Sequence, residues 1–328
     1  MPAPDAERRD PQVARLALAS LTTLKVGGEA EVWTCDHDGA VRDATRADFR
    51  VLGGGSNLLV GDDGVPERVV RLGRAYADTQ ALDANGDAWL GAAVPLPGLV
   101  RRARQLGLSG LEGVLGIPAQ LGGAVVMNAG TRFGEIGDAL QEVELMIDGR
   151  VERVAAADLG LGYRRSALPP RAVVLRARLR LTPSTPERVA QAEEAVDAAR
   201  RGQPKARSAG CAFKNPPGDA AGRLIDAAGL KGCRVGGAMV AHEHANFVIN
   251  LGDATAADVV GLLERVRAAV DVPLEIEWRR WGLAGGDPAV PGWDRVAPPG
   301  SGSGAADGSG GGAGGCGSGA PSAGPGGA

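Results

Sequence analysis

The sequence predicts an α+β protein with two folded regions. Three observations support this prediction. Residues 20 to about 180 contain short apolar segments separated by glycine, which is typical of strands and turns. Residues 185 to 282 have a different pattern of predicted elements, in which helical segments alternate with short extended ones. A Pro/Ser/Thr cluster from Thr182 to Pro186 lies between them, so we expect a domain boundary there.

The first region is expected to be rich in strands. The segment from Val173 to Leu179 alternates apolar and polar side chains, as a half-buried strand does. One helix, from Leu96 to Leu106, interrupts the strands, because Pro97 suits its first turn and Gly107 suits its end. The expected strands are residues 30–33, 49–52, 68–72, 88–90, 143–147 and 173–179.

The second region is expected to begin with a charged helix from Pro186 to Arg201. A helix at residues 220–228 and short strands ending at residues 246–250 follow. A strongly periodic helix from Ala256 to Val270 then leads to a closing strand from Leu274 to Trp281. This order indicates a separate, smaller α+β domain.

The predicted domain limits follow from these changes in composition and in the pattern of predicted elements. We expect an N-terminal extension at residues 1–19, a first domain at 20–182 and a second domain at 183–283. The remainder, 284–328, is expected to be disordered. From Gly300 to Ala328, 14 of 29 residues are glycine, so this segment buries too little apolar surface to offset the entropy of ordering.

Composition excludes several classes of partner. The formal charge of -3 gives no reason to expect nucleic acid or an anionic membrane, and no apolar run is long enough for a membrane span. Charges and prolines in residues 1–11 replace the apolar core of a secretory signal, so we expect a cytoplasmic protein. The four cysteines show no CxxC spacing, and His242 and His244 lack a third ligand, so no metal site is expected.

Two glycine-rich segments are candidates for ligand binding. Gly53, Gly54, Gly55, Ser56 and Asn57 follow the apolar pair Val51-Leu52, and their backbone N–H groups can converge on an anion. A glycine-rich hairpin without a ligand is an equal alternative.

The second segment, residues 113–130, has too many glycines for a helix interior and too much apolar content for an exposed loop. A buried loop against a flat apolar ligand satisfies both constraints, and a tight core crossover is the alternative.

Three further patterns are candidates for chemistry. Cys211 lies in a small-residue turn, Ser208-Ala209-Gly210-Cys211, and its thiol can carry and release a proton. The segment from Tyr163 to Ser166 contains arginines that can bind a carboxylate, although taken alone it favours a solvated loop. In the closing strand, Glu277 and Arg279 share one face, so Arg279 could orient Glu277; an exposed edge strand is the alternative.

Taken in order along the chain, these segments resemble the UDP-N-acetylenolpyruvoylglucosamine reductase family of peptidoglycan synthesis. The resemblance covers residues 20 to 282 and matches the shorter of the family's two types, which lacks an insertion near the substrate loop. The matching segments are TLKVGG (23–28), GGGSN (53–57), GIPAQLGGAVVMNAG (116–130), YRRS (163–166), SAGCAFKNP (208–216), AGRLIDAAGLKG (221–232), residues 237–247 and residues 274–282.

The resemblance implies a two-part FAD-binding region of the vanillyl-alcohol-oxidase type, followed by a smaller α+β substrate-binding domain. It implies non-covalent FAD as cofactor and NADPH as co-substrate. The implied substrate is a UDP-sugar enolpyruvyl ether, to whose terminal vinyl carbon the flavin delivers hydride. The charge left beside the substrate carboxylate must then be stabilised and quenched by a proton. We expect a monomer.

The resemblance also implies roles for single residues. Arg164 matches the arginine that stabilises the developing enolate, and Glu277 matches the carboxylic acid that helps to polarise it. Cys211 stands where the family usually has a serine proton donor. The implied cofactor contacts are Gly53, Gly54, Gly55, Ser56 and Asn57 for the diphosphate and Ile117, Gly122 and Gly123 for the flavin ring. The implied substrate contacts are Tyr163, Asn215 and Arg279.

Three departures from the family pattern bear on this interpretation. Cys211 replaces serine, but a thiol, with an ordinary pKa of ~8.5, is a stronger acid than an alcohol. Ala119 stands where the family often has glycine, and Glu243 replaces a frequent lysine.

Two other functions remain open from the sequence. An oxidase of the same flavin fold is one, and a noncatalytic nucleotide-sugar binding protein, which would not need Arg164, Cys211 and Glu277 together, is the other.

Overall fold

The computed structural model describes residues 10–284 of the chain. The N-terminal extension predicted for residues 1–19 is therefore described only from residue 10 onward. The tail predicted for residues 284–328 lies outside the described residues, apart from residue 284.

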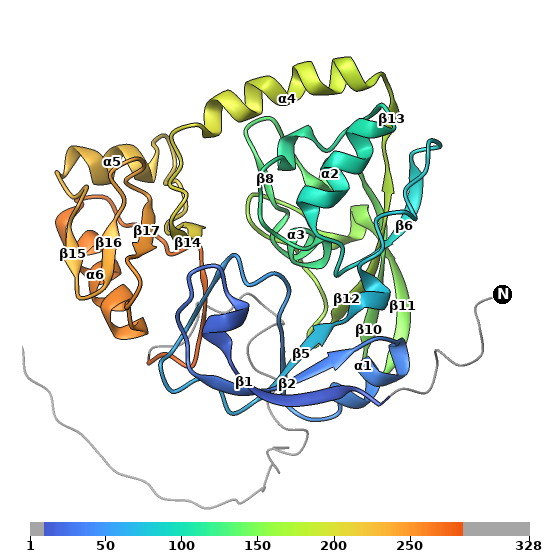
Figure 1. The fold of residues 1–328 in the computed structure, drawn as a ribbon, viewed down its shortest axis with the longest axis horizontal. Coiled ribbons are helices and arrows are strands. Elements are labelled where there is room, and N and C mark those ends of the chain that lie inside the picture. The colour runs from blue at the N-terminus through green and yellow to red at the C-terminus, as the bar shows by residue number, and fades with distance from the viewer. Residues whose placement is uncertain (1–9, 285–328) are drawn as a thin grey trace, which may run out of the picture. The chain divides into compact units, whose positions relative to one another are not determined.

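The first sheet lies in the N-terminal part of the chain (Figure 1). Its strand order is β1-β2-β5-β3, in which β2, β5 and β3 are parallel and β1 is an antiparallel edge strand. The strands are β1 (Gln12–Ala17), β2 (Glu29–Cys35), β3 (Phe49–Val51) and β5 (Arg68–Leu72). Helix α1 (Asp38–Ala44) packs on this sheet, and the His37 Nδ1 accepts a hydrogen bond from the Ala40 amide at its first turn.

Strand β1 was not predicted. All six of its residues are exposed, so it has no buried face and no alternating apolar pattern to reveal it. It is fixed by its antiparallel register with β2, from the pair Gln12–Thr34 to the pair Ala17–Glu29.

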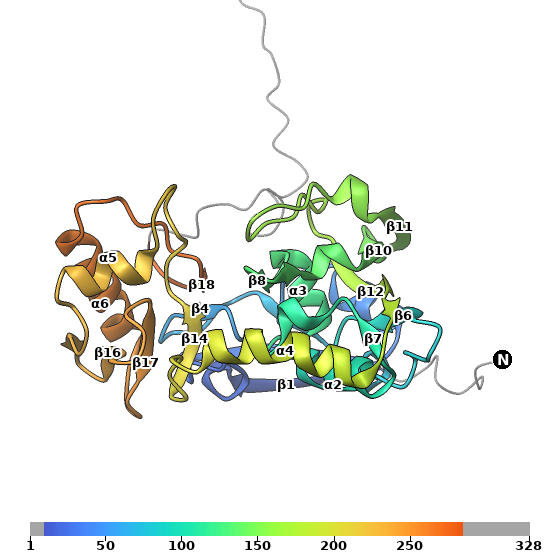
Figure 2. The same ribbon diagram turned by 90° about the horizontal axis from the view of Figure 1, so that it is seen from above.

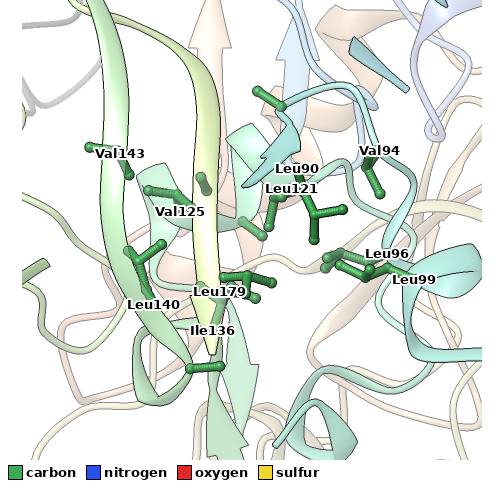
Figure 3. Packing of buried hydrophobic residues seen from close by; sticks show 14 of the residues in the cluster. Leu90, Val94, Leu96, Leu99, Leu121, Val125, Ile136, Leu140, Val143 and Leu179 are labelled. Carbon is green, nitrogen blue, oxygen red and sulfur yellow. The ribbon is translucent and has the colours of Figure 1, made fainter. Parts of the chain in front are cut away.

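The second sheet is antiparallel, with the order β11-β10-β12-β6. Its strands are β6 (Asp87–Gly91), β10 (Leu140–Ile147), β11 (Arg150–Ala155) and β12 (Val173–Arg180). Helices α2 (Leu96–Gln105) and α3 (Leu121–Met127) pack on it through a large leucine- and valine-rich core, in which Leu90, Leu121 and Leu179 are fully buried (Figure 3). Burial of each such side chain contributes about 1.5–3 kcal/mol, which makes this core a rigid support for α3.

Helix α3 corrects the prediction of a loop at residues 113–130. Its seven residues include Gly122 and Gly123, whose low helix propensity argued against it. Packing overrides that propensity: a Cβ on Gly122 would lie 2.8 Å from the Ala92 Cβ, so only glycine permits this close approach. Asn128 ends the helix in the left-handed conformation, with φ of 42°.

The C-terminal part begins with α4 (Pro186–Arg200), whose N-cap Thr185 accepts a hydrogen bond from the Arg188 amide. Its sheet has the order β14-β17-β16-β15, and α5 (Ala221–Ala227) and α6 (Ala256–Ala269) pack with it, as both views of the ribbon show (Figures 1 and 2). The strands are β14 (Arg207–Cys211), β15 (Arg234–Val235), β16 (Ala238–Val240) and β17 (Phe247–Asn250).

The closing strand differs from the prediction. Only β18 (Arg279–Trp281) is a strand, and it pairs in parallel with β4 (Leu58–Val60) of the first region. Residues 274–278 run alongside the Cys211 segment instead, where Ile276 bridges Phe213 and the Glu277 amide donates to the Ala212 carbonyl at 2.8 Å. Residues 274–281 therefore connect the two regions directly.

Short elements complete the described chain. Two two-stranded pairs are β7 (Leu108–Ser109) with β13 (Thr182–Pro183) and β8 (Gly130–Thr131) with β9 (Gly134–Glu135). The 3-10 helices are residues 18–21, 74–76, 112–114, 136–138 and 156–159. No helix formed by the described residues has the length and apolarity that crossing a membrane requires.

Candidate active site

One cavity of about 1070 Å³ brings together the residues that the sequence singled out. All fourteen of the predicted site residues line it, although their elements come from three parts of the chain. They are Gly53, Gly54, Gly55, Ser56, Asn57, Ile117, Gly122, Gly123, Tyr163, Arg164, Cys211, Asn215, Glu277 and Arg279. The roles assigned to them stay predictions.

The cavity wall is strongly basic, in contrast to the net charge of -3 of the whole chain. Its single acidic residue is Glu277, whereas eight basic side chains line it: Lys25, Arg50, Arg71, Arg164, Arg200, Lys205, Arg207 and Arg279. A basic cavity of this size favours an anionic ligand, because its charges attract phosphate and carboxylate groups.

The glycine loop at residues 53–57, which follows β3, is a candidate anion cradle. Gly55 has a φ of 63°, and a Cβ there would lie 2.3 Å from the Leu21 carbonyl oxygen, so glycine is required. Within residues 10–284, the amides of Gly53, Gly54 and Ser56 donate to no protein acceptor. Neighbouring backbone amides without a protein acceptor are suited to phosphate oxygens.

Helix α3 forms the cavity wall next to this loop, and a Cβ on Gly53 would lie 4.0 Å from the Gly123 amide nitrogen. A Cβ on Gly123 would meet no atom within 4 Å, because this position faces the open cavity. The Ala119 side chain packs against the core of the second sheet, and its carbonyl accepts a hydrogen bond from the Leu96 amide at 2.9 Å. The methyl group of Ala119, which the family's glycine lacks, thus packs partly against this core.

Arg164 and Glu277 form a partly buried ion pair inside the cavity. The Arg164 Nε lies 2.9 Å from the Glu277 Oε1, and the Arg164 Nη2 donates to the Gly130 carbonyl at 2.8 Å. Arg164 has a φ of 55°, an unusual conformation for a non-glycine residue that is consistent with a functional constraint. Arg164, from the second sheet region, is thus paired with Glu277. An orienting role for Arg279 stays a prediction.

Burial raises the pKa of Glu277, and the Arg164 guanidinium opposes that rise. The Asn57 side-chain amide donates to the Glu277 carbonyl at 3.3 Å, so the glycine loop also fixes the backbone of this residue. The carboxyl is therefore held beside a cation and close to the loop by bonds from two directions.

Cys211 lies at a β-bulge. Ser208 pairs with Ile249 and Cys211 with Phe247, so Ala209 and Gly210 together oppose a single residue of β17. Gly210 supplies the φ of 77° that this bulge needs. Because a bulge changes which way the next side chain points, it explains why a glycine precedes this cysteine.

The Cys211 thiol stays protonated at neutral pH. Burial raises its pKa to about 12, the Glu277 charge adds to the rise, and Arg164 and Arg200 oppose it. The structure thus favours a proton-carrying thiol over a reactive thiolate.

Tyr163 and Asn215 connect the second sheet region with the C-terminal part. The Tyr163 hydroxyl accepts a hydrogen bond from the Asn215 amide, and the Arg164 guanidinium lies 4.9 Å from the Tyr163 ring centroid. The Asn215 Oδ1 accepts from the Ala221 amide at 3.0 Å, where α5 begins. Only the NH₂ group of the Asn215 side chain then remains as a donor for a ligand.

The histidines of the second region have structural contacts. The His244 Nδ1 accepts from the Asn246 amide at 3.2 Å, and burial lowers its pKa. The described part of the chain contains no set of three His, Cys, Asp or Glu side chains arranged for a metal ion.

Sequence reasoning missed several cavity residues. Arg200 ends the charged helix, lines the cavity, and donates from its Nη2 to the Gly116 carbonyl at 2.8 Å. Arg71 interrupts the otherwise apolar end of a predicted strand, and this interruption was the available signal. Arginine is so frequent in this chain that neither residue stood out.

Comparison with known proteins identifies the family. A family model described as "UDP-N-acetylenolpyruvoylglucosamine reductase, C-terminal domain" matches residues 203–280, and one described as "FAD binding domain" matches residues 36–155. The UDP-N-acetylenolpyruvoylglucosamine reductase of Thermus thermophilus is 55% identical over 270 residues, which cover 82% of this chain and 99% of that protein. The chain belongs to the UDP-N-acetylenolpyruvoylglucosamine reductase family.

Other members of the reductase family agree with this assignment. The Deinococcus radiodurans reductase is 51% identical over 282 residues, which cover 84% of this chain and 97% of that protein. The crystal structure of the Thermus caldophilus reductase superposes with a TM-score of 0.78 at 55% identity, over 83% of this chain and 99% of that one. The expected FAD-binding region followed by a smaller α+β domain is thereby confirmed, and the protein is an FAD-dependent oxidoreductase.

Proposed function

We propose that this protein reduces the enolpyruvyl ether of UDP-N-acetylglucosamine to UDP-N-acetylmuramate, with NADPH as reductant, in cytoplasmic peptidoglycan precursor synthesis. The observation that carries the proposal is the Arg164–Glu277 pair in one basic cavity with the protonated Cys211. The printed names of the relatives support the same reaction class.

The residues present fit FAD. The loop at residues 53–57 offers backbone amides without protein acceptors, and Gly123 leaves open space in the neighbouring wall. In this proposal Gly53 to Asn57 hold the diphosphate, and Ile117, Gly122 and Gly123 line the flavin ring. When bound, FAD supplies the hydride that originates from NADPH.

Arg164 and Glu277 would act on the substrate carboxylate. Hydride addition to the terminal vinyl carbon leaves an electron pair on the carbon that bears the carboxylate, and the charge spreads onto the carboxylate oxygens. The Arg164 guanidinium, already held by Glu277 and the Gly130 carbonyl, stabilises that charge without reorganising. In this proposal Glu277 keeps Arg164 in place through their ion pair.

Cys211 would then donate the proton that completes the reaction. The S–H bond breaks as the new C–H bond forms, and the thiolate regains its proton from solvent. Because burial raises the pKa of Cys211 to about 12, the thiol begins every cycle protonated, as a general acid must. The nearby guanidinium of Arg200 opposes that rise and favours the thiolate that the transfer leaves.

The remaining basic side chains would bind the rest of the substrate. Tyr163, Asn215 and Arg279 are proposed as substrate contacts, and Lys205 and Arg207 add charge suited to a diphosphate. In this proposal the protein acts as a monomer, without nucleic acid or membrane as partner.

An anaerobic titration tests the proposal. Purified yellow protein should lose its visible flavin absorbance on addition of NADPH and regain it with the enolpyruvyl sugar. Recovery with oxygen but not with the sugar would instead identify an oxidase of the same fold. Protein that binds the UDP-sugar but takes up no FAD would indicate the noncatalytic alternative.

A further inference from the structure

Arg71 lies beside the glycine loop in the first sheet. It is the fourth residue of β5 and pairs with Thr34 of β2. On the other side, Val70 pairs with Val51 of β3, so Arg71 lies next to the chain that runs from Val51 into Gly53. Carboxyl ends of parallel strands meet at one edge of a sheet, and this edge faces the cavity that Arg71 lines.

A second arginine on the same face offers an internal comparison. Arg50 of β3 also lines the cavity, but its Nη2 lies 2.9 Å from the Glu67 Oε1, and its guanidinium lies 5.5 Å from the Trp281 ring centroid. The charge of Arg50 is therefore balanced within the protein.

Arg71 has no such balance. Within residues 10–284, no carboxylate lies within ion-pair distance of its guanidinium. The side chain is partly buried, and this burial lowers its pKa with no acidic group opposing the shift. A partly buried cation without a counter-ion is costly, so an anion at this position would stabilise it.

We propose that Arg71 is a further cofactor-binding residue, whose guanidinium contacts a phosphate oxygen of the FAD diphosphate beside the amides of Gly53 to Ser56. This inference rests on the proposed placement of the diphosphate, and it is independent of the proposed reaction. A guanidinium suits this position because its planar N–H groups can bind two phosphate oxygens at once.

Titration of the apoprotein with FAD, followed by flavin fluorescence, tests the contact without any turnover. Arg71→Met should raise the dissociation constant of FAD about 10- to 100-fold, the usual effect of losing a hydrogen bond to a charged group. Arg71→Lys should recover part of the affinity, because it keeps the charge. The matched control is Arg74→Met, three residues away, which removes an exposed arginine outside the cavity.

Salt dependence separates a phosphate contact from a structural role. Raising KCl from about 50 mM to about 500 mM should weaken FAD binding more in wild type and Arg74→Met than in Arg71→Met, because salt screens the ionic contact. The inference is overturned if Arg71→Met binds FAD as tightly as Arg74→Met, or if its salt dependence equals that of wild type. Wild-type protein that reduces the enolpyruvyl sugar while Arg71→Met binds FAD normally would refute the Arg71 contact alone. Wild-type protein that does not reduce the enolpyruvyl sugar, together with weakened FAD binding by Arg71→Met, would refute the proposed reaction alone.

Discussion

Replacing Gly123 by alanine should separate the stability of the apoprotein from its affinity for FAD. Gly123 is the third residue of α3, and a Cβ there meets no protein atom within 4 Å. Alanine in a helix is favoured over glycine by about 0.5–1 kcal/mol, so the apoprotein should gain up to that amount. A gain of about 1 kcal/mol corresponds to a rise in Tm of about 1.5–2 °C for a folded region of this size.

The methyl group of Gly123→Ala should also weaken the binding of FAD. It projects into the cavity at the wall where the flavin ring is proposed to lie, and overpacking by one methyl costs about 1–3 kcal/mol. FAD affinity should fall about tenfold or more. The neighbouring Gly122→Ala is the matched control, because its Cβ would lie 2.8 Å from the Ala92 Cβ and should destabilise the apoprotein itself.

The assay combines thermal unfolding of apoprotein with fluorescence titration by FAD for wild type and both variants. A Gly123→Ala apoprotein that unfolds at a lower temperature than wild type would show that the position is not open. Unchanged FAD affinity in that variant would refute the placement of the flavin against α3.

Three further predictions concern the reacting groups and the contact between regions. Cys211→Ala should lower the rate of substrate reduction about 10²- to 10⁴-fold while flavin reduction by NADPH persists. Cys211→Ser should keep measurable turnover. Full activity of the alanine variant in stopped-flow assays would exclude Cys211 as the acid. Because burial raises the pKa of Glu277, the folded state holds that proton more strongly than the unfolded state does. The free energy of unfolding of wild type relative to Glu277→Gln should therefore decrease as pH rises from the ordinary glutamate pKa through the raised one, and pH-independent differences in urea unfolding would contradict this. Asp62 of the first region accepts hydrogen bonds from the Ala256 and Ala257 amides in the first turn of α6. Asp62→Ala should therefore lower the free energy of unfolding by about 0.5–2 kcal/mol, and an unchanged urea midpoint would show that this contact is not stabilising.

The fold was predictable where a buried face imposes a pattern. Strand β12 alternates because one of its faces packs on the core, and α2 has the expected Pro97 near its start. Strand β1 has all six residues exposed, so its position depends on backbone pairing with β2. Such pairing does not require an alternation of apolar and polar side chains. The prediction of a loop at α3 was wrong because its glycines were taken as helix breakers. The close packing of Gly122 on Ala92 is what requires glycine there.

The site was predictable through family resemblance more than through local chemistry. The resemblance selected Arg164 and Glu277, which are 113 residues apart in sequence, and the structure pairs them at 2.9 Å. No pattern along the chain reveals such a pair, because it depends on how two regions pack. Arg71 was missed because it is an ordinary residue type for this chain, and only its missing counter-ion distinguishes it.

The pairing of β18 with β4 has a consequence for the order of events during synthesis. Asn57 and Glu277, which bond to each other beside the anion cradle, are 220 residues apart in sequence. A nascent chain can form both sheets of the FAD-binding region early, but the cavity lacks its acidic residue and one wall until Trp281 has emerged from the ribosome. Closing so long a loop is a late and entropically costly step, so cofactor loading should follow the release of nearly the entire folded chain.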